Sequence, residues 1–248
     1  MPMNRQTFLR LVAAGGASAL ALRAFGQATS ASAAPTATPW GRLRYRSLGG
    51  DTTNWGVHPQ GDLNFIDHLH ENTTVRLDRR WNVADVASLD AMTGHPMLFM
   101  HGERPPELTD GECANLREYL LRGGFLLAED CVIGSSTMGH NTANDFFFRR
   151  MAEYDLARIL PEGRLRRLPN DHPVFHAVFD QPNGLPHMQG TPHGLHGLEY
   201  QGRLVALLSP SDIHCGWTSG DNWFGPGKSR EAFRMGANFY TFAMTQTA

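Results

Sequence analysis

The sequence predicts an α/β fold with a mostly parallel central sheet, helices on both faces of that sheet and a late β-hairpin. Two short runs, "PMLFM" (96–100) and "FLLA" (125–128), are almost uniformly apolar, as expected for strands that are buried on both faces. Segments with apolar residues at helical spacing lie between runs of this kind. Because strands that alternate with helices are typical of parallel sheets, these observations together favour the α/β class.

Each expected element has a local signal. Residues 108–124 form the clearest helix, because Thr109 and Glu112 can make a capping box at its start and a Gly-Gly pair ends it. The pair Gln201-Gly202 separates two apolar runs and predicts the hairpin. The other expected helices are residues 62–73, 85–92, 144–161 and 230–244, and the other expected strands are 43–48, 75–77 (a weak strand), 96–100 and 125–128.

Residues 1–28 have the layout of an export signal peptide. A basic start with Arg5 and Arg10 precedes a weakly apolar run and then small residues that suit cleavage. The segment "NRQTFLR" is similar to a twin-arginine export signal, but Gln6 stands where the second arginine is expected, so the twin-arginine and general secretory pathways both stay open. We therefore expect a periplasmic or secreted protein. Its mature chain would consist of a flexible linker (29–40) and a single α/β domain (41–248).

Composition and charge exclude some partners. The formal net charge is −2, and loss of the three arginines in the signal makes it −5. Lys228 is the only lysine and the arginines are scattered, so there is no basic face for nucleic acid. No apolar stretch of the mature chain reaches the roughly 20 residues of a membrane span. The expected partner is a small molecule or another protein.

Polar side chains follow four of the expected strands. In a parallel sheet the carboxyl ends of the strands meet at one edge, and ligands bind beyond that edge. The candidate residues are Asp51, Asn54 and Trp55 after the first strand, His101 and Glu103 after 96–100, Glu129, Asp130 and Cys131 after 125–128, and Asp212, His214, Cys215 and Trp217 after the hairpin. Some of these have a structural alternative: Asp51 and Asn54 suit a turn, Asp212 suits a cap, and Trp217 suits the core.

Longer stretches resemble a known family. The segments "LREYLLRGGFLLAEDC", "DHPVFHAVF", "LHGLEYQGRLVALLSPSDIHCGW" and "AFRMGANFYTFAMT" are similar to the family known as domain of unknown function 4159. The similarity runs from about Leu43 to the C-terminus. That family is allied by fold to class I glutamine amidotransferase-like proteins, so the resemblance implies a flavodoxin-like three-layer α/β/α sandwich. It implies no activity, because the family has no established one.

The catalytic residues of the amidotransferases do not carry over. Those enzymes hold a cysteine on a sharp strand-to-helix turn that is flanked closely by glycines, and they have a late His-x-Glu pair. Cys131 lies at a comparable place, but its neighbours are Asp130 and Val132, and His196 and Glu199 are separated by two residues. An acidic neighbour also raises the pKa of a thiol and so weakens it as a nucleophile. We therefore expect no glutamine amidotransferase activity.

The cysteines leave several interpretations open. Cys131 and Cys215 both lie at strand ends on the same predicted edge of the sheet, so they can form a disulfide in an oxidising compartment, serve as soft ligands of a metal with His101 or His214, or pack unpaired. Cys113 lies on the inner face of a helix and suits the core.

A loop rich in proline and glycine contains His187, His193 and His196. Zinc or copper accepts such ligands, but the spacing matches no metal signature, so a structural loop is favoured. His101 is the better single candidate, and we expect it to face Asp130.

Two classes of function follow. We favour an extracytoplasmic protein that binds a small ligand, a metal or a protein partner at the carboxyl edge of its sheet. The alternative is a hydrolase in which Asp130 and His101 are catalytic and position water directly or on a divalent metal, with Cys131 as a ligand or lining residue. Clustering of Asp130, His101 and a residue from 212–215 within roughly 5 Å would favour the hydrolase.

Overall fold

The computed structural model describes residues 37–132 and 145–246. The predicted signal peptide and most of the predicted linker lie outside these ranges. The linker prediction is wrong at its end. Trp40 is 1% exposed and packs against Phe65 and Phe99, with ring centroids 5.0 and 5.5 Å away. A bulky indole in the core fixes the chain before residue 41.

The centre of the fold is a seven-stranded sheet with the order β2-β1-β3-β4-β7-β6-β5. All neighbouring strands are parallel except at β5–β6 and β6–β7, which are antiparallel. The strands are β1 (Gly41–Arg44), β2 (Asn82–Asp85), β3 (Met97–Gly102), β4 (Phe125–Asp130), β5 (Arg164–Arg167), β6 (His196–Tyr200) and β7 (Arg203–Ser209). The order around β1 is that of a flavodoxin-like sheet, so the predicted class is confirmed.

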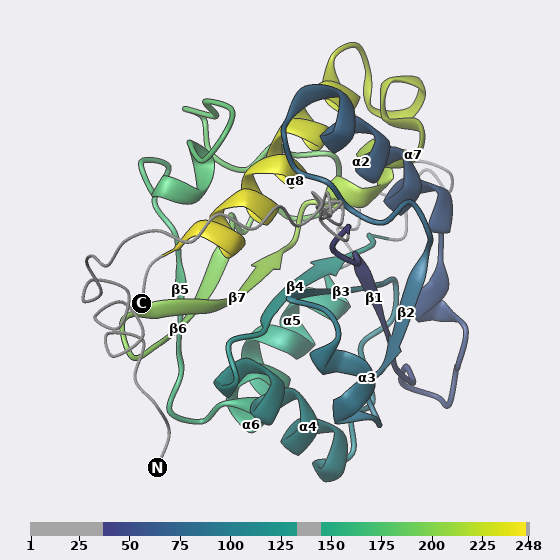
Figure 1. The fold of residues 1–248 in the computed structure, drawn as a ribbon, viewed down its shortest axis with the longest axis vertical. Helices are drawn as coiled ribbons and strands as arrows, with labels where there is room; N and C mark the ends of the chain where they lie inside the picture. The colour runs from purple at the N-terminus through teal and green to yellow at the C-terminus, as the bar shows by residue number, and fades with distance from the viewer. Residues whose placement is uncertain (1–36, 133–144, 247–248) are drawn as a thin grey trace, which may run out of the picture. The chain divides into compact units, whose positions relative to one another are not determined.

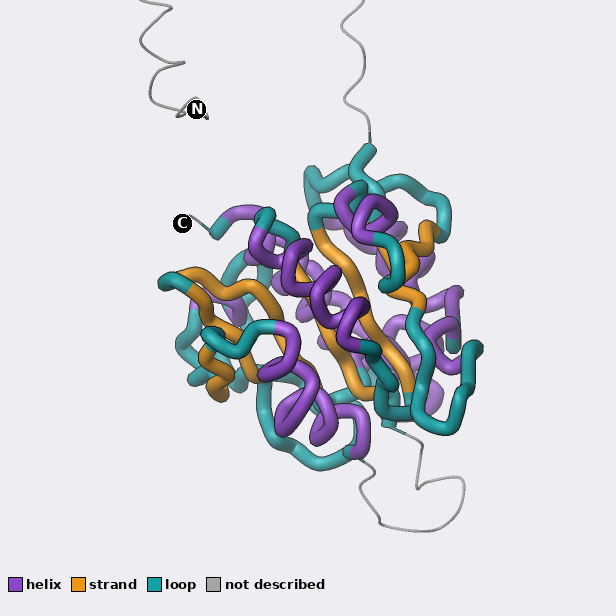
Figure 2. The backbone as a smooth tube through the Cα atoms, turned by 90° about the horizontal axis from the view of Figure 1, so that it is seen from below, coloured by secondary structure: helices purple, strands orange, loops and turns teal. Residues whose placement is uncertain are grey.

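Helices cover both faces of this sheet (Figures 1 and 2). One face carries α2 (Pro59–Asn72), α7 (Ile213–Phe224) and α8 (Lys228–Thr245). The other carries α3 (Leu89–Thr93), α4 (Asp110–Leu121), α5 (Phe146–Arg150) and α6 (Leu156–Ile159). The remaining helical elements of the described ranges are three short turns: η1 (Asn54–Gly56), η2 (Met151–Asp155, a π-helical turn) and η3 (Pro173–Phe175).

The alternation of side chains along the central strands divides the core in two. Along β3, Leu98 and Met100 pack on the α4 side, whereas Met97 and Phe99 pack on the α2–α7–α8 side. Because the period is two residues, His101 continues the Phe99 row and faces α2 and α7. This parity decides which strand-end groups can meet.

Local chemistry explains several boundaries. The capping box of α4 is present: Glu112 N donates to Thr109 Oγ1 at 3.2 Å, and Thr109 N donates to Glu112 Oε2 at 2.7 Å. The predicted hairpin is confirmed, with Gln201 and Gly202 at positive φ (50° and 78°), as a type I′ turn requires.

Other element predictions need correction. The first strand ends at Arg44 rather than at residue 48, and residues 75–77 contribute only an isolated bridge from Leu77 to Thr38. The edge strand that pairs with β1 on the side away from β3 is β2, which the sequence pattern did not indicate. The expected helix 144–161 is present over residues 146–159 as the continuous run of α5, η2 and α6, with a π-helical turn in its middle that the sequence did not indicate. No helix in the described ranges is long and apolar enough to cross a membrane.

Candidate functional site

Polar side chains form a buried layer at the carboxyl ends of β1, β3, β4 and β7, on the face that α2 and α7 cover. Arg42 lies in β1, His101 ends β3, and Asp62 comes from α2. Every member of the layer is at most 3% exposed: Arg42, Asp62, His101, Glu129, Cys131, Ser209, Asp212, His214 and Cys215. Buried polar groups are costly unless they have partners, so the contacts of each one determine whether the fold alone accounts for it.

Three of these residues form a cluster with potential metal-ligand atoms. A ring nitrogen of His101, the sulfur of Cys131 and a carboxylate oxygen of Asp212 all lie within 4.8 Å of one another. His101 Nε2 and Asp212 Oδ1 are buried and have no hydrogen-bond partner in the described part of the protein. The other oxygen of Asp212 accepts from the Gln189 side chain. Asp212 also has a positive φ of 55°, a conformation that costs energy outside glycine.

Cys215 lies beside this cluster. Its sulfur is 3.9 Å from that of Cys131, and both cysteines are free thiols. A disulfide would bring the sulfurs to about 2.05 Å. Two thiolates on one tetrahedral zinc, with bonds of about 2.3 Å, would lie about 3.8 Å apart. The contact with Cys215, followed by burial, raises the pKa of the Cys131 thiol well above its usual range. A thiol with a raised pKa is a poor nucleophile at neutral pH.

Arg42 organises the layer. Its Nε and Nη2 donate to the two oxygens of Asp62 at 3.0 and 2.9 Å, which makes a fully buried bidentate ion pair. Its Nη1 donates to the Trp55 carbonyl at 2.9 Å. The same guanidinium is 3.3 Å from Nδ1 of His101 and 2.9 Å from Nε2 of His214.

Burial, with the guanidinium charge added to it, keeps both imidazoles neutral. Burial, the charge on the neighbouring His214 and the charge on Arg42 lower the pKa of His101 well below its usual value. Burial and then Arg42 lower the pKa of His214 to about 4. For Asp62, burial is the largest single effect and raises the pKa, but the charges of Arg42 and His214 and their hydrogen bonds together outweigh it, so the net pKa is lowered. The pair is therefore ionised while the histidines beside it are not.

Glu129 has a structural task in this layer. Its carboxyl oxygens accept from Ser209 Oγ at 2.7 Å and from the backbone N–H groups of Ile213 and His214 at 2.9 Å each. These two amides begin α7, so Glu129 ties the start of that helix to β4. Burial and the nearby Asp212 raise the pKa of Glu129 to about 8.

Asp130 does not face His101, and that prediction is wrong. The register places His101 beside Glu129 and Asp130 beside Gly102, so Asp130 points to the opposite face of the sheet. There it accepts from the backbone N–H of Phe148 at 2.9 Å. Burial raises the pKa of Asp130 to about 8. Its position in the α5 packing explains why it is absent from the His–Cys–Asp cluster.

The residues predicted after the first strand build a turn above β3. Asp51 Oδ1 accepts from Thr53 N at 2.7 Å, and Asn54 Oδ1 accepts from Arg104 N at 2.8 Å. The Asn54 amide donates to Glu103 at 3.3 Å. The Trp55 ring stacks on Trp81 with centroids 5.7 Å apart. Among them, Glu103 reaches the cluster electrostatically, because its charge contributes to raising the pKa of Cys131 and of Asp212.

Trp217 is a core residue, 1% exposed and stacked on Phe65 at 4.4 Å. The three loop histidines have separate partners, although the rings of His193 and His196 both pack against Phe148, at 4.6 and 5.3 Å between ring centroids. His193 Nε2 contacts Asp145 at 2.6 Å, and His196 Nδ1 contacts the Gly194 carbonyl at 3.1 Å. His187 lines a separate pocket.

The sequence-based search missed Arg42, Asp62 and Gln189. A signal existed for Arg42, because a charged residue at an inward position of an apolar strand needs a buried partner. Nothing in the local pattern points to Asp62 as that partner, and nothing marks Gln189.

Together these features define an α/β protein of flavodoxin-like architecture with a buried His–Cys–Asp cluster at the carboxyl edge of its sheet. The chain belongs to the family described as domain of unknown function DUF4159, which matches residues 40–244. A comparison with curated proteins gave no match. The alliance of the family with amidotransferase-like proteins stays a prediction.

Proposed function

We propose that this chain is an extracytoplasmic metal-binding protein whose site consists of His101, Cys131 and Asp212. One observation carries the proposal: three potential ligand atoms lie within 4.8 Å of one another, and two groups of the cluster, His101 Nε2 and Asp212 Oδ1, are buried without a partner. A cation would satisfy both groups at once, because it accepts lone pairs from nitrogen and oxygen alike.

The donor set selects the class of metal. One imidazole nitrogen, one thiolate and one carboxylate suit zinc or a similar first-row transition ion, whereas magnesium and calcium prefer oxygen alone. Cys215, with its sulfur 3.9 Å from that of Cys131, is close enough to become a fourth ligand after a change of rotamer. Binding would release the thiol proton of Cys131, so affinity should rise with pH.

Metal binding at His101 would cost one hydrogen bond from Arg42. Since Arg42 donates to His101 Nδ1, the proton of the neutral ring lies on Nε2. A metal on Nε2 must displace that proton and move it to Nδ1, which breaks the 3.3 Å contact. Arg42 still keeps Asp62 and the Trp55 carbonyl as partners, so the network survives the exchange.

The test is metal analysis and zinc titration of the full chain, with two matched cysteine variants. The wild type should bind one zinc ion per chain. Zinc should protect a thiol from modification, and a chelator should remove that protection. C131A should weaken zinc binding by at least about tenfold, because one of three ligands is lost. C113A is the control: Cys113 is also buried, but it packs in the core on the other side of the sheet. If the wild type binds no metal, or if C131A binds zinc as tightly as C113A does, the proposal is wrong.

A metal-assisted hydrolase is the second candidate. It is favoured by the number of ligands: three protein ligands leave one position for water, as in catalytic zinc sites. Asp130 would not take part, since it points to the opposite face. Zinc-loaded protein should then hydrolyse simple ester or phosphate ester substrates, and C131A should abolish the reaction while C113A should not. Metal binding without any such turnover favours the binding protein.

Export is the remaining part of the proposal, and it rests on the sequence of residues 1–28. Fractionation of cells that express the full chain should find a shortened form outside the cytoplasm. An Arg5→Ala/Arg10→Ala variant should stay in the cytoplasm at full length.

A further inference from the structure

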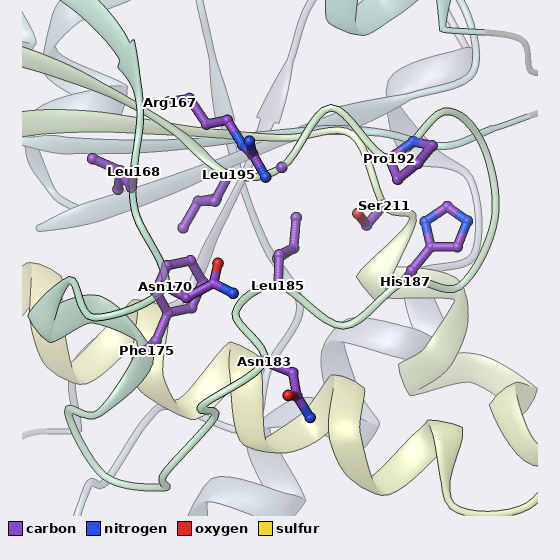
Figure 3. Close-up of a pocket in the computed structure, with 11 residues that line it drawn as sticks. Arg167, Leu168, Asn170, Phe175, Asn183, Leu185, His187, Pro192, Leu195 and Ser211 are labelled. Carbon is purple, nitrogen blue, oxygen red and sulfur yellow. The ribbon is translucent and has the colours of Figure 1, made fainter.

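A pocket of about 200 Å³ lies among the loops between β5 and β6 and beside η3 (Figure 3). Its floor is apolar and buried, with Leu168, Phe175 and Leu195 each at most 2% exposed. The volume equals that of roughly six or seven water molecules in the liquid, at about 30 Å³ each. It is below the range of about 300–1,000 Å³ that is typical for drug-sized ligands, so the pocket suits a smaller molecule.

Five polar residues also line the pocket, and none of their side chains carries a negative charge. They are Arg167, Asn170, Asn183, His187 and Ser211. No carboxylate lines the pocket, and none of these five side chains makes a hydrogen bond to another part of the described chain. Most arginines in the described ranges pair with a carboxylate, such as Arg166 with Glu199 at 3.0 Å, whereas Arg167 has no such partner there. A donor-rich wall without acidic residues favours an anion.

Glycines hold two of these side chains in place. Gly194 has a φ of 79°, and a Cβ on it would lie 2.5 Å from Nε of Arg167. Gly184 also has a φ of 79°, and a Cβ on it would lie 2.7 Å from Cγ of Asn170. The guanidinium and the amide therefore rest directly on glycine backbone. Backbone hydrogen bonds from Leu168 to Leu195 (2.8 Å) and from Met188 to Ser211 (3.1 Å) tie the walls together. Such pre-organisation reduces the cost of ordering on binding.

We propose that this pocket binds a small monocarboxylate with a short aliphatic body. The carboxylate would pair with the planar fork of Arg167, and the aliphatic body would cover the accessible apolar surface of Leu185 and Pro192, which also line the pocket. Inorganic phosphate offers the charge but has nothing to place on that apolar surface. This inference does not depend on the metal site, because neither His101 nor Cys131 lines the pocket.

The test is a calorimetric titration of the full chain with isovalerate, supported by NMR of the histidine rings. We expect a dissociation constant of roughly 1 mM or lower and a shift of the His187 signals. Arg167→Ala should raise the dissociation constant by about tenfold or more, because a charged hydrogen bond is lost. Arg164→Ala is the matched control: it removes an exposed arginine from the same strand, outside the pocket.

Two further probes separate charge from shape. Isovaleramide, the uncharged analogue, should bind at least about tenfold more weakly than isovalerate, and inorganic phosphate should not compete. The proposal is overturned if isovalerate does not bind saturably, if R167A and R164A behave alike, or if the amide or phosphate binds as well as isovalerate. Unchanged thermal unfolding of R167A, expected for an exposed side chain, ensures that lost binding is not lost folding.

Discussion

The Asp130→Asn substitution tests whether the carboxyl group of Asp130 is held neutral in the fold. This side chain is 1% exposed and accepts a hydrogen bond from Phe148 N at 2.9 Å. Burial raises its pKa from 3.8 to about 8. Between these two values the unfolded chain is ionised and the folded chain is protonated. A raised pKa contributes stability that is complete below about pH 4 and is lost as the pH rises through about 8.

The magnitude follows from the width of this window. Each pKa unit corresponds to about 1.36 kcal/mol, so the wild type should lose roughly 2–3 kcal/mol through this group between about pH 5 and about pH 7. The asparagine variant has nearly the same shape, can still accept from Phe148 N through its amide oxygen, and does not titrate. The stability of D130N relative to the wild type should therefore rise by that amount over the same interval and level off above about pH 8.

The assay is urea unfolding of both proteins at several pH values. A chelator is present so that no metal ion binds at the neighbouring Cys131. Equal m-values ensure that the midpoints report stability. Asp171→Asn is the control, because Asp171 is exposed and its side chain has no hydrogen-bond partner in the described ranges. As a substitution at an exposed position, this control should change the free energy of unfolding by no more than about 0.5 kcal/mol. A D130N difference that stays flat, or that falls as the pH rises, would refute the idea that Asp130 is protonated in the folded protein.

Two further substitutions test the packing around the site by chemical unfolding. Arg42→Met should lower the free energy of unfolding by about 3–5 kcal/mol, because it leaves Asp62 charged and unpaired in the interior. The Arg42→Met/Asp62→Met double variant should recover part of that loss, and a single variant as stable as the wild type would contradict a buried ion pair. Gly236→Ala should cost about 1–3 kcal/mol, because its Cβ would lie 2.5 Å from the Trp217 ring, whereas Gly111→Ala, with its nearest atom 4.0 Å away, should be neutral or stabilising. Equal effects at the two glycines would show that α8 does not need the close approach.

The fold was predictable where the signal was local. The buried runs that became β3 and β4, the capping box of α4 and the Gln201-Gly202 turn each depend on residues close together in sequence. The strands β2 and β5 were missed because each has only four residues and lies at an edge of the sheet, where burial imposes little pattern. In β2, only Ala84 is buried.

The candidate site was predictable only in outline. The expectation that strand ends meet at one edge names His101, Cys131 and Asp212, and the structure brings these three together. The expectation that Asp130 joins them failed because a shift of one residue along a strand reverses the face. Arg42 in β1 pairs with Asp62 in α2, which is 20 residues further along the chain. The spacing of apolar residues within a strand or a helix does not indicate a pair of this kind.

The distribution of satisfied and unsatisfied groups separates structural polarity from the candidate site. Glu129 accepts hydrogen bonds from three donors and holds the start of α7 against β4. The bidentate Arg42–Asp62 pair joins β1 to α2, so both sets of groups have a structural role. Apolar residues of similar volume often serve as well for stability alone. His101 Nε2 and Asp212 Oδ1 are buried without a partner, and so are other side-chain atoms of the described chain, among them His214 Nδ1 and Trp40 Nε1. The cluster differs from these because the potential ligand atoms of His101, Cys131 and Asp212 lie within 4.8 Å of one another, and because Asp212 also holds a left-handed backbone conformation. Such a meeting of groups that depart from the rules of a stable core is where a ligand would bind.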